Sequence, residues 1–209
     1  MKEILLFVNN KKNKKIIKTK RNKICVVGVS KKIGVTHLCL CLANFLSSAL
    51  GKRVIYVELR RNSQLLSVVG LKQVLIGKMI GYEYKGVRYV LSDDTEAIRQ
   101  LMMTEKAWFV VDMESLNNDT HTIFTNCNNR IIIGSLSPWC KKELYDFFIN
   151  NNIEEYDIDN MRLALKNKTK KEKDDFLSYY NIKEFDVPFI EDPFSLKEEH
   201  FNHLFKLLA

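Results

Sequence analysis

The stretch that decides the fold is residues 24–37, which reads Ile24-Cys25-Val26-Val27-Gly28-Val29-Ser30-Lys31-Lys32-Ile33-Gly34-Val35-Thr36-His37. Its first six residues form an apolar run, typical of a strand buried on both faces of a parallel sheet. The apolar segment that continues to Leu50 predicts a helix, with Gly51 as its C-terminal stop. A strand, a tight loop and a helix N-terminus in this order present backbone N–H groups and a positive helix end, an arrangement suited to phosphate.

Outside this stretch, apolar strands alternate with helices. Strands are expected at residues 53–59, 108–112, 131–135, 161–165 and 184–190, and helices at residues 93–104, 139–150, 170–180 and 195–208. Residues 63–78 are expected to be helical or looping, and residues 81–90 to form a hairpin around Lys85-Gly86. This alternation predicts an α/β fold of three layers, in which a mostly parallel sheet carries helices on both faces.

We expect residues 1–209 to form a single domain, because the chain is long enough to bury a sizeable core and shows no internal repeat or linker. Within this domain, residues 1–22 are expected to be a basic N-terminal extension, a β-hairpin with strands at residues 2–8 and 15–19. Hydrophobic residues make up 46% of the chain and charged residues 28%, a balance that indicates a globular protein and excludes a disordered one.

The composition also predicts a cytoplasmic location. No apolar run reaches the ~18 residues that a membrane span needs, and the N-terminus lacks the small-residue cleavage site of a secretory signal. The cysteines form no CxxC pair and no zinc spacing with histidine, so buried thiols are the simpler interpretation. They are Cys25, Cys39, Cys41, Cys127 and Cys140.

The formal net charge of +8 raises the question of nucleic-acid binding. Lysines crowd residues 11–23 and residues 166–173. Few aromatic residues interleave with either group, and neither matches a motif that reads a nucleic-acid groove. Solvated loops explain both groups more simply, so binding to nucleic acid is the weaker expectation.

The order and spacing of several motifs resemble the MinD/ParA family of deviant P-loop ATPases, from about residue 23 onward. The family's KGGxGKTT loop aligns with residues 30–37, and its acid-x-Asp-Pro-Gln motif with residues 58–62. Its Walker B strand aligns with residues 108–112, its late strand with a base-contacting Asn with residues 163–167, and its closing VPF segment with residues 187–189. The resemblance implies a P-loop NTPase-like fold of the MinD/ParA type.

The resemblance also implies which residues would contact a nucleotide, if one binds. These are Gly28, Ser30, Lys31, Lys32, Ile33, Gly34, Val35, Thr36, His37, Asn167 and Pro188. Thr36 and Asp112 would then hold a magnesium ion that accompanies ATP or ADP. No residue is assigned a catalytic role.

Five positions depart from the family pattern. The P-loop lysine, which neutralises the β- and γ-phosphates, is replaced by Val35, and the family's second, signature lysine by Ser30. The two loop glycines are Lys31 and Lys32, whose Cβ atoms disfavour positive φ, and Arg60 replaces the acid that orients the attacking water. Loss of a close cation in a shielded site is enough to abolish hydrolysis if nothing replaces it.

These departures favour a non-hydrolysing adaptor or localisation module with a protein partner, and any homodimer would not be gated by nucleotide. The first alternative is an active ATPase that uses Lys31 or Lys32 as its phosphate cation. Tyr179 and Lys183 weakly resemble the catalytic pair of short-chain dehydrogenases, but no suitable serine precedes them. The last helix, residues 195–208, could contact a membrane, although docking on the sheet is the favoured interpretation.

Overall fold

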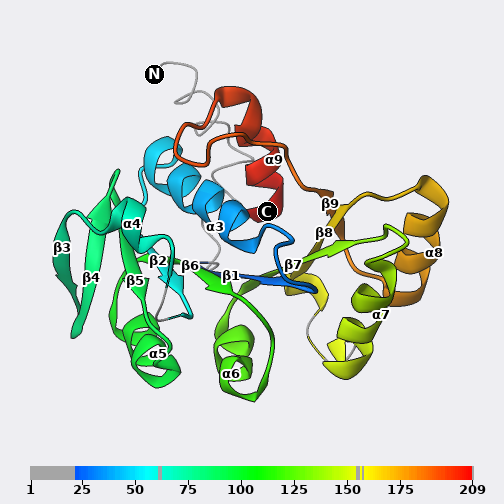
Figure 1. The fold of residues 1–209 in the computed structure, drawn as a ribbon, viewed down its shortest axis with the longest axis horizontal. Coiled ribbons are helices and arrows are strands. Elements are labelled where there is room, and N and C mark those ends of the chain that lie inside the picture. Colours follow the sequence, from blue (N-terminus) through cyan, green and yellow to red (C-terminus); the bar gives the residue numbers. More distant parts are fainter. Residues whose placement is uncertain (1–21, 61–62, 154–155, 157, 209) are drawn as a thin grey trace.

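The computed structural model describes residues 22–60, 63–153, 156 and 158–208. The hairpin expected from strands 2–8 and 15–19 lies outside these residues. The described residues form a nine-stranded sheet in the order β3-β4-β5-β2-β6-β1-β7-β8-β9 (Figure 1). The strands are β1 Lys23–Gly28, β2 Val54–Glu58, β3 Gln73–Ile76, β4 Met79–Tyr84, β5 Val87–Leu91, β6 Trp108–Met113, β7 Asn129–Ser135, β8 Met161–Lys166 and β9 Glu184–Asp186.

Parallel pairing runs without interruption from β5 across the sheet to β9. Only β4 and β3 extend the sheet in antiparallel fashion beyond β5. The predicted mostly parallel sheet is therefore confirmed. Because the strands run the same way, the loops that follow β1, β2, β6, β7 and β8 all open at one edge of the sheet.

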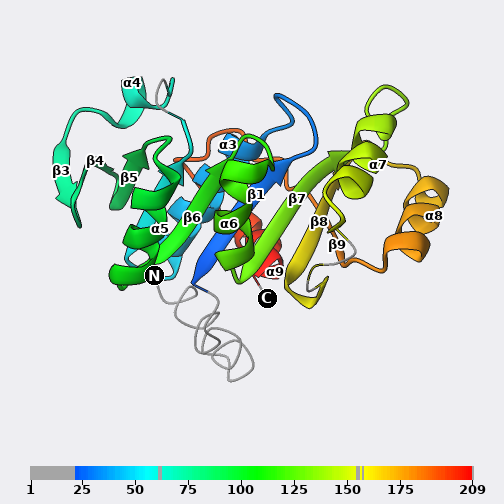
Figure 2. The same ribbon diagram turned by 90° about the horizontal axis from the view of Figure 1, so that it is seen from below.

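Helices cover both faces, as the three-layer prediction requires. The helical elements are α3 Val35–Asn44, η1 Phe45–Ala49, α4 Leu66–Val69, α5 Thr95–Thr104, α6 Asn118–Asn126, α7 Lys141–Asn150, η3 Ile158–Asn160, α8 Lys170–Tyr180 and α9 Glu198–Leu208. One face carries α3, η1 and α9, and Figure 2 looks onto the other, which carries α5, α6, α7 and α8. The segment η1 continues α3 as one turn of π-helix.

The apolar run of β1 is explained by its central place between these layers. Cys25 and Val27 pack into the core under α5–α8, and Ile24 and Val26 pack into the core under α3 and α9. Side chains of a strand point alternately to opposite faces, so a strand covered on both sides needs apolar residues throughout.

The last helix, α9, docks on the domain. The rings of Phe45 and Phe201 have centroids 5.3 Å apart, and Leu204 is fully buried. The side-chain amide of Asn129 donates a 2.9 Å hydrogen bond to the carbonyl oxygen of Leu207. The favoured interpretation of residues 195–208 is confirmed, with the helix starting at Glu198. In the described part of the chain, no helix has the length and apolar character to cross a bilayer.

Some expected elements were wrong in extent or missing. Residues 73–76, expected within a helical or looping piece, form strand β3. The prediction contained no helix at residues 118–126; α6 begins there because Asn117 and Thr120 form a capping box. The strand expected at 184–190 stops at Asp186, shortly before Pro188, whose ring nitrogen cannot donate to a ladder.

Candidate functional site

The loop between β1 and α3 is filled by its own side chains. A Cβ atom placed on Gly28 would lie 2.7 Å from Cγ2 of Ile33 and 2.8 Å from Cγ2 of Val35. Both branched side chains therefore sit directly on the Gly28 backbone, and the Ile33 side chain is buried. In a phosphate-binding loop, backbone N–H groups face the interior that these carbons occupy. Beside Gly28, the inside of the loop is therefore lined by two apolar side chains.

Lys31 and Lys32, which replace the two glycines of the family loop, do not prevent this loop from forming. Lys32 has φ of 61°, in the left-handed region, and Gly34 has φ of 104°. The cost for a residue with a Cβ atom in that region is about 1 kcal/mol, which the fold tolerates here. Lys31 and Lys32 are both exposed.

A different lysine contacts the loop. Lys166, the last residue of β8, donates a 2.6 Å hydrogen bond from Nζ to the carbonyl oxygen of Ile33. Its Nζ also lies 2.9 Å from the point where a Cβ of Gly34 would be. Burial lowers the pKa of the Lys166 amine. Within the described residues, Lys166 makes no ion pair, so its charge faces the space beside the start of α3.

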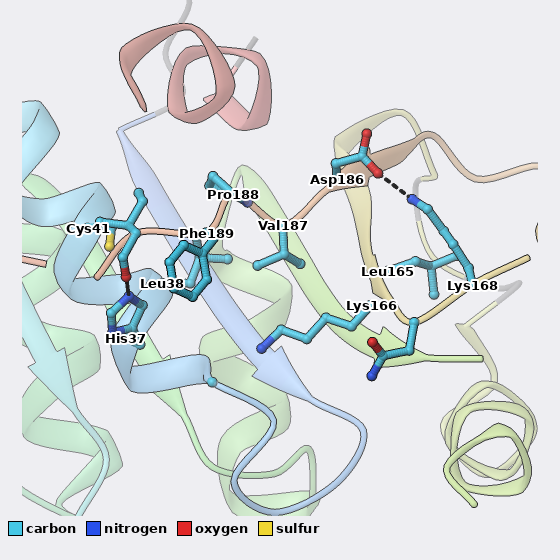
Figure 3. Close-up of a pocket in the computed structure, with 13 residues that line it drawn as sticks. His37, Leu38, Cys41, Leu165, Lys166, Lys168, Asp186, Val187, Pro188 and Phe189 are labelled. Atoms are coloured by element: carbon cyan, nitrogen blue, oxygen red, sulfur yellow. Dashed lines mark hydrogen bonds and ion pairs between the residues drawn. The ribbon is translucent and has the colours of Figure 1, made fainter. Parts of the chain in front are cut away.

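Lys166 lines a pocket of about 690 Å³ between α3, the end of β8 and the segment that follows β9 (Figure 3). Four of the predicted nucleotide-contacting residues lie in its wall: Gly34, His37, Asn167 and Pro188. The other seven, Gly28, Ser30, Lys31, Lys32, Ile33, Val35 and Thr36, do not line it. The pocket thus brings Gly34 and His37 next to Asn167 and Pro188, whereas most of the loop does not line it.

The pocket's remaining wall is mostly apolar. Leu38, Leu165 and Val187 line it. Phe189 also lines the pocket, although its side chain is 91% exposed. His37 is held by a 2.7 Å hydrogen bond between Nε2 and the carbonyl oxygen of Ile190, drawn in Figure 3. That contact ties the first turn of α3 to the segment after β9. Lys168 also lines the pocket, paired with Asp186. Such a pocket can hold an apolar or flat group beside the Lys166 amine.

Thr36 and Asp112, the predicted magnesium ligands, are brought together. The Thr36 hydroxyl lies near enough to the Asp112 carboxyl group to lower its pKa, and the Tyr56 hydroxyl donates to Asp112 Oδ2 over 2.8 Å. Burial raises the pKa of Asp112, and the neighbouring Thr36 and Tyr56 hydroxyls oppose that rise in part. Nothing in the sequence analysis singled out Tyr56, although its place two residues before the end of β2 put it beside the Walker B strand.

Hydroxyl and carboxylate oxygens are donor types that Mg²⁺ accepts. Tyr56 already occupies one Asp112 oxygen, and no group of three or more His, Cys, Asp or Glu side chains in the described part of the chain could hold a metal ion. One hydroxyl and one carboxyl group are fewer ligands than a magnesium ion takes. A magnesium ion here would need further oxygen ligands from a bound nucleotide.

Arg60 stands where the family pattern has the acid that orients water. Its Nη2 lies 2.9 Å from Glu114 Oε2, and its Nε lies 4.0 Å from Glu58 Oε1. Glu58 also accepts a hydrogen bond from the Ser63 hydroxyl, and burial raises the pKa of its carboxyl group. A guanidinium stays protonated, so Arg60 cannot act as a general base in place of that acid.

The basic cluster at residues 166–173 is partly neutralised. Lys168 pairs with Glu184 and lies 2.7 Å from Asp186, and Lys173 lies 3.7 Å from Glu184. These contacts weaken the cluster as a surface for nucleic-acid phosphates.

No family model and no curated protein matches this chain. Solved structures do match. A MinC:MinD cell division complex from Aquifex aeolicus superposes with a TM-score of 0.64 at 12% identity, covering 89% of this chain and 94% of the other. A ParA family ATPase from Chlorobium tepidum gives 0.61 at 10% identity, with 88% and 89% covered. A cobyrinic acid a,c-diamide synthase from Mycobacterium smegmatis, with a bound ATP analogue and magnesium, gives 0.59 at 13%, with 90% and 93% covered.

These similarities show the fold. It is the MinD/ParA type of P-loop NTPase fold, as the order of the motifs predicted.

Proposed function

We propose that this protein is a MinD/ParA-like domain that does not hydrolyse ATP and acts as an adaptor or localisation module for a protein partner. One observation carries the proposal: Ile33 and Val35 lie over the backbone of Gly28, and Val35 stands at the position where the family pattern has its phosphate-binding lysine.

The proposal follows from what phosphoryl transfer requires. The reaction depends on cations that neutralise charge on the transferred phosphoryl group and on a group that positions water. Val35 brings no charge, Ser30 cannot bridge a dimer as the signature lysine would, and Arg60 is paired with acids. Any homodimer of this chain is therefore expected to form without regard to nucleotide.

A protein partner is supported by analogy and by the surface. One structural neighbour is described as a complex of MinD with MinC, and several aliphatic side chains of this chain are exposed. Membrane contact through α9 has less support, because the helix buries its apolar face. We place the protein in the cytoplasm, since the cysteines among the described residues are free and four of them are buried.

The test is a phosphate-release assay on the purified protein with ATP and Mg²⁺, beside calorimetry with the same nucleotide. We expect no turnover above a buffer control. Turnover at an ordinary family rate that disappears in Lys31→Ala or Lys32→Ala would overturn the proposal and establish the alternative.

That alternative is an ATPase of the MinD/ParA type, binding ATP or ADP with magnesium. The contact between Thr36 and Asp112 and the pocket beside Gly34 favour it, because both are parts that such a site needs. Lys31 or Lys32 would have to turn inward and displace Ile33 or Val35 to supply the missing charge. For this reason we rank it second.

A further inference from the structure

The segment from α4 to β4 exposes more large apolar side chains than any other part of the described chain. They are Leu66, Val68, Leu71, Leu75 and Ile80. Leu71 is 90% exposed, Leu75 70% and Ile80 64%. Exposed aliphatic residues gathered in one place mark an interaction site more often than scattered ones do. We call these five residues the α4–β4 patch.

The patch adjoins a free strand edge. β3 is the outermost strand of the sheet, and no described strand pairs with its outer side (Figure 1). The backbone N–H of Glu83 donates to the carbonyl oxygen of Lys72 over 2.8 Å. Hydrogen-bonded pairs alternate along an antiparallel ladder, so Val74 and Ile76 point their backbone groups toward β4. The N–H and C=O groups of Gln73 and Leu75 then point outward, where another strand can take them.

The side chains of β3 would contact any strand that pairs with its free edge. Ile76 is buried under α5, and neighbouring residues of a strand point to opposite faces, so Leu75 faces the other way. Leu75 lies directly opposite Ile80 in the ladder, in a pair whose side chains approach closely. An added strand would place its own side chains against Leu75 and extend the apolar surface.

Charge decides what kind of strand fits. Lys72 and Lys78 flank β3 at its two ends. Glu83 is shared by two cations, with Lys72 Nζ at 2.6 Å and Arg88 Nε at 4.0 Å from its carboxyl oxygens, so these three side chains leave a net positive charge at the Lys72 end. An antiparallel pair of two copies would bring both lysines of each copy to one short edge, which repulsion opposes. A segment with acidic residues on either side of an apolar centre complements the same edge.

We propose that β3 and the α4–β4 patch dock an extended segment of a partner protein, apolar in the middle and acidic at its ends, by strand addition. The inference rests on the proposed adaptor function and names the surface that such an adaptor would use. Main-chain hydrogen bonds to Gln73 and Leu75 would supply affinity, and Leu75 and Ile80 would select apolar side chains.

The test selects binders from a displayed library of random peptides on the full chain. We expect the selected peptides to alternate apolar residues between acidic ends. Their binding should weaken at least about tenfold in Leu75→Glu, since a charge replaces an apolar contact at the centre of the site. Gln73→Pro, which removes an outward N–H without touching the ladder to β4, should weaken binding too. Met103→Glu, at an equally exposed residue on α5, is the matched control and should bind as the parent does.

The proposal is overturned if the selected peptides lack this pattern, if none is selected, or if Leu75→Glu binds as well as Met103→Glu. A dimer in light scattering that Leu75→Glu dissociates would assign the edge to a second copy and also overturn it. Circular dichroism of each variant checks folding. The phosphate-release assay is independent of these results: turnover defeats the proposed function, whereas absent turnover with absent peptide binding defeats the docking surface alone.

Discussion

Substitution of Gly28 by alanine tests whether the loop interior is filled. The new Cβ atom would lie 2.7 Å from Ile33 Cγ2 and 2.8 Å from Val35 Cγ2, with the carbonyl oxygen of Ser30 at 3.2 Å. Non-bonded carbon atoms settle at about 3.5–4.0 Å. Two branched side chains must therefore move by the better part of an ångström, and both are attached to the loop and first turn that carry α3.

The expected cost is that of adding a methyl group to a packed interior, about 1–3 kcal/mol. The backbone adds no further penalty, because the φ angle of Gly28 is not positive. Urea denaturation of the parent and of Gly28→Ala measures the difference in the free energy of unfolding. We expect a lower midpoint with an unchanged slope.

A mutant cycle separates crowding from other effects. Ile33→Ala and Val35→Ala each remove one of the two close methyl groups, so Gly28→Ala should cost less in either background, by about 0.5–3 kcal/mol. Ile33→Ala will itself destabilise the protein because its side chain is buried. If Gly28→Ala is neutral in the parent, or costs the same in all three backgrounds, the loop interior is open and our account of the site is wrong.

Three further predictions follow from the same structure. Burial raises the pKa of Asp112 in the folded chain. Above the ordinary aspartate pKa the folded chain therefore holds more protons than the unfolded chain, and the free energy of unfolding falls as pH rises through that window. Asp112→Asn should flatten this fall in a series of denaturation curves at different pH, and a steeper fall would contradict the prediction. Burial lowers the pKa of Lys166, so competitive amine labelling read by mass spectrometry should show its reactivity rising at a lower pH than is ordinary for lysine, whereas an ordinary midpoint would place its amine in water. Leu204→Ala should cost about 2–5 kcal/mol in thermal or urea unfolding, because the Leu204 side chain on α9 is fully buried against the domain. An unchanged stability would mean that α9 is not docked.

Local patterns in the chain were enough to predict the layers. The apolar run at residues 24–29 needs cover on both sides, and the helix after it ends at Gly51, whose φ of 59° suits glycine. The helix at residues 170–180 was predicted with its observed bounds. By contrast, α6 has few apolar residues, and its start depends on hydrogen bonds between Asn117 and Thr120, a signal that hydrophobic periodicity does not contain.

The sequence alone determined that this chain would build a P-loop type of fold, and that valine and serine stand where its lysines belong. Only the tertiary structure decided what occupies the loop and which cation reaches it. Ile33 and Val35 are near Gly28 in sequence, but whether they fold over it depends on how the loop packs against the sheet. Lys166 lies more than a hundred residues away. It meets Ile33 because β8 and β1 run parallel on either side of β7, so their carboxyl ends open at the same edge.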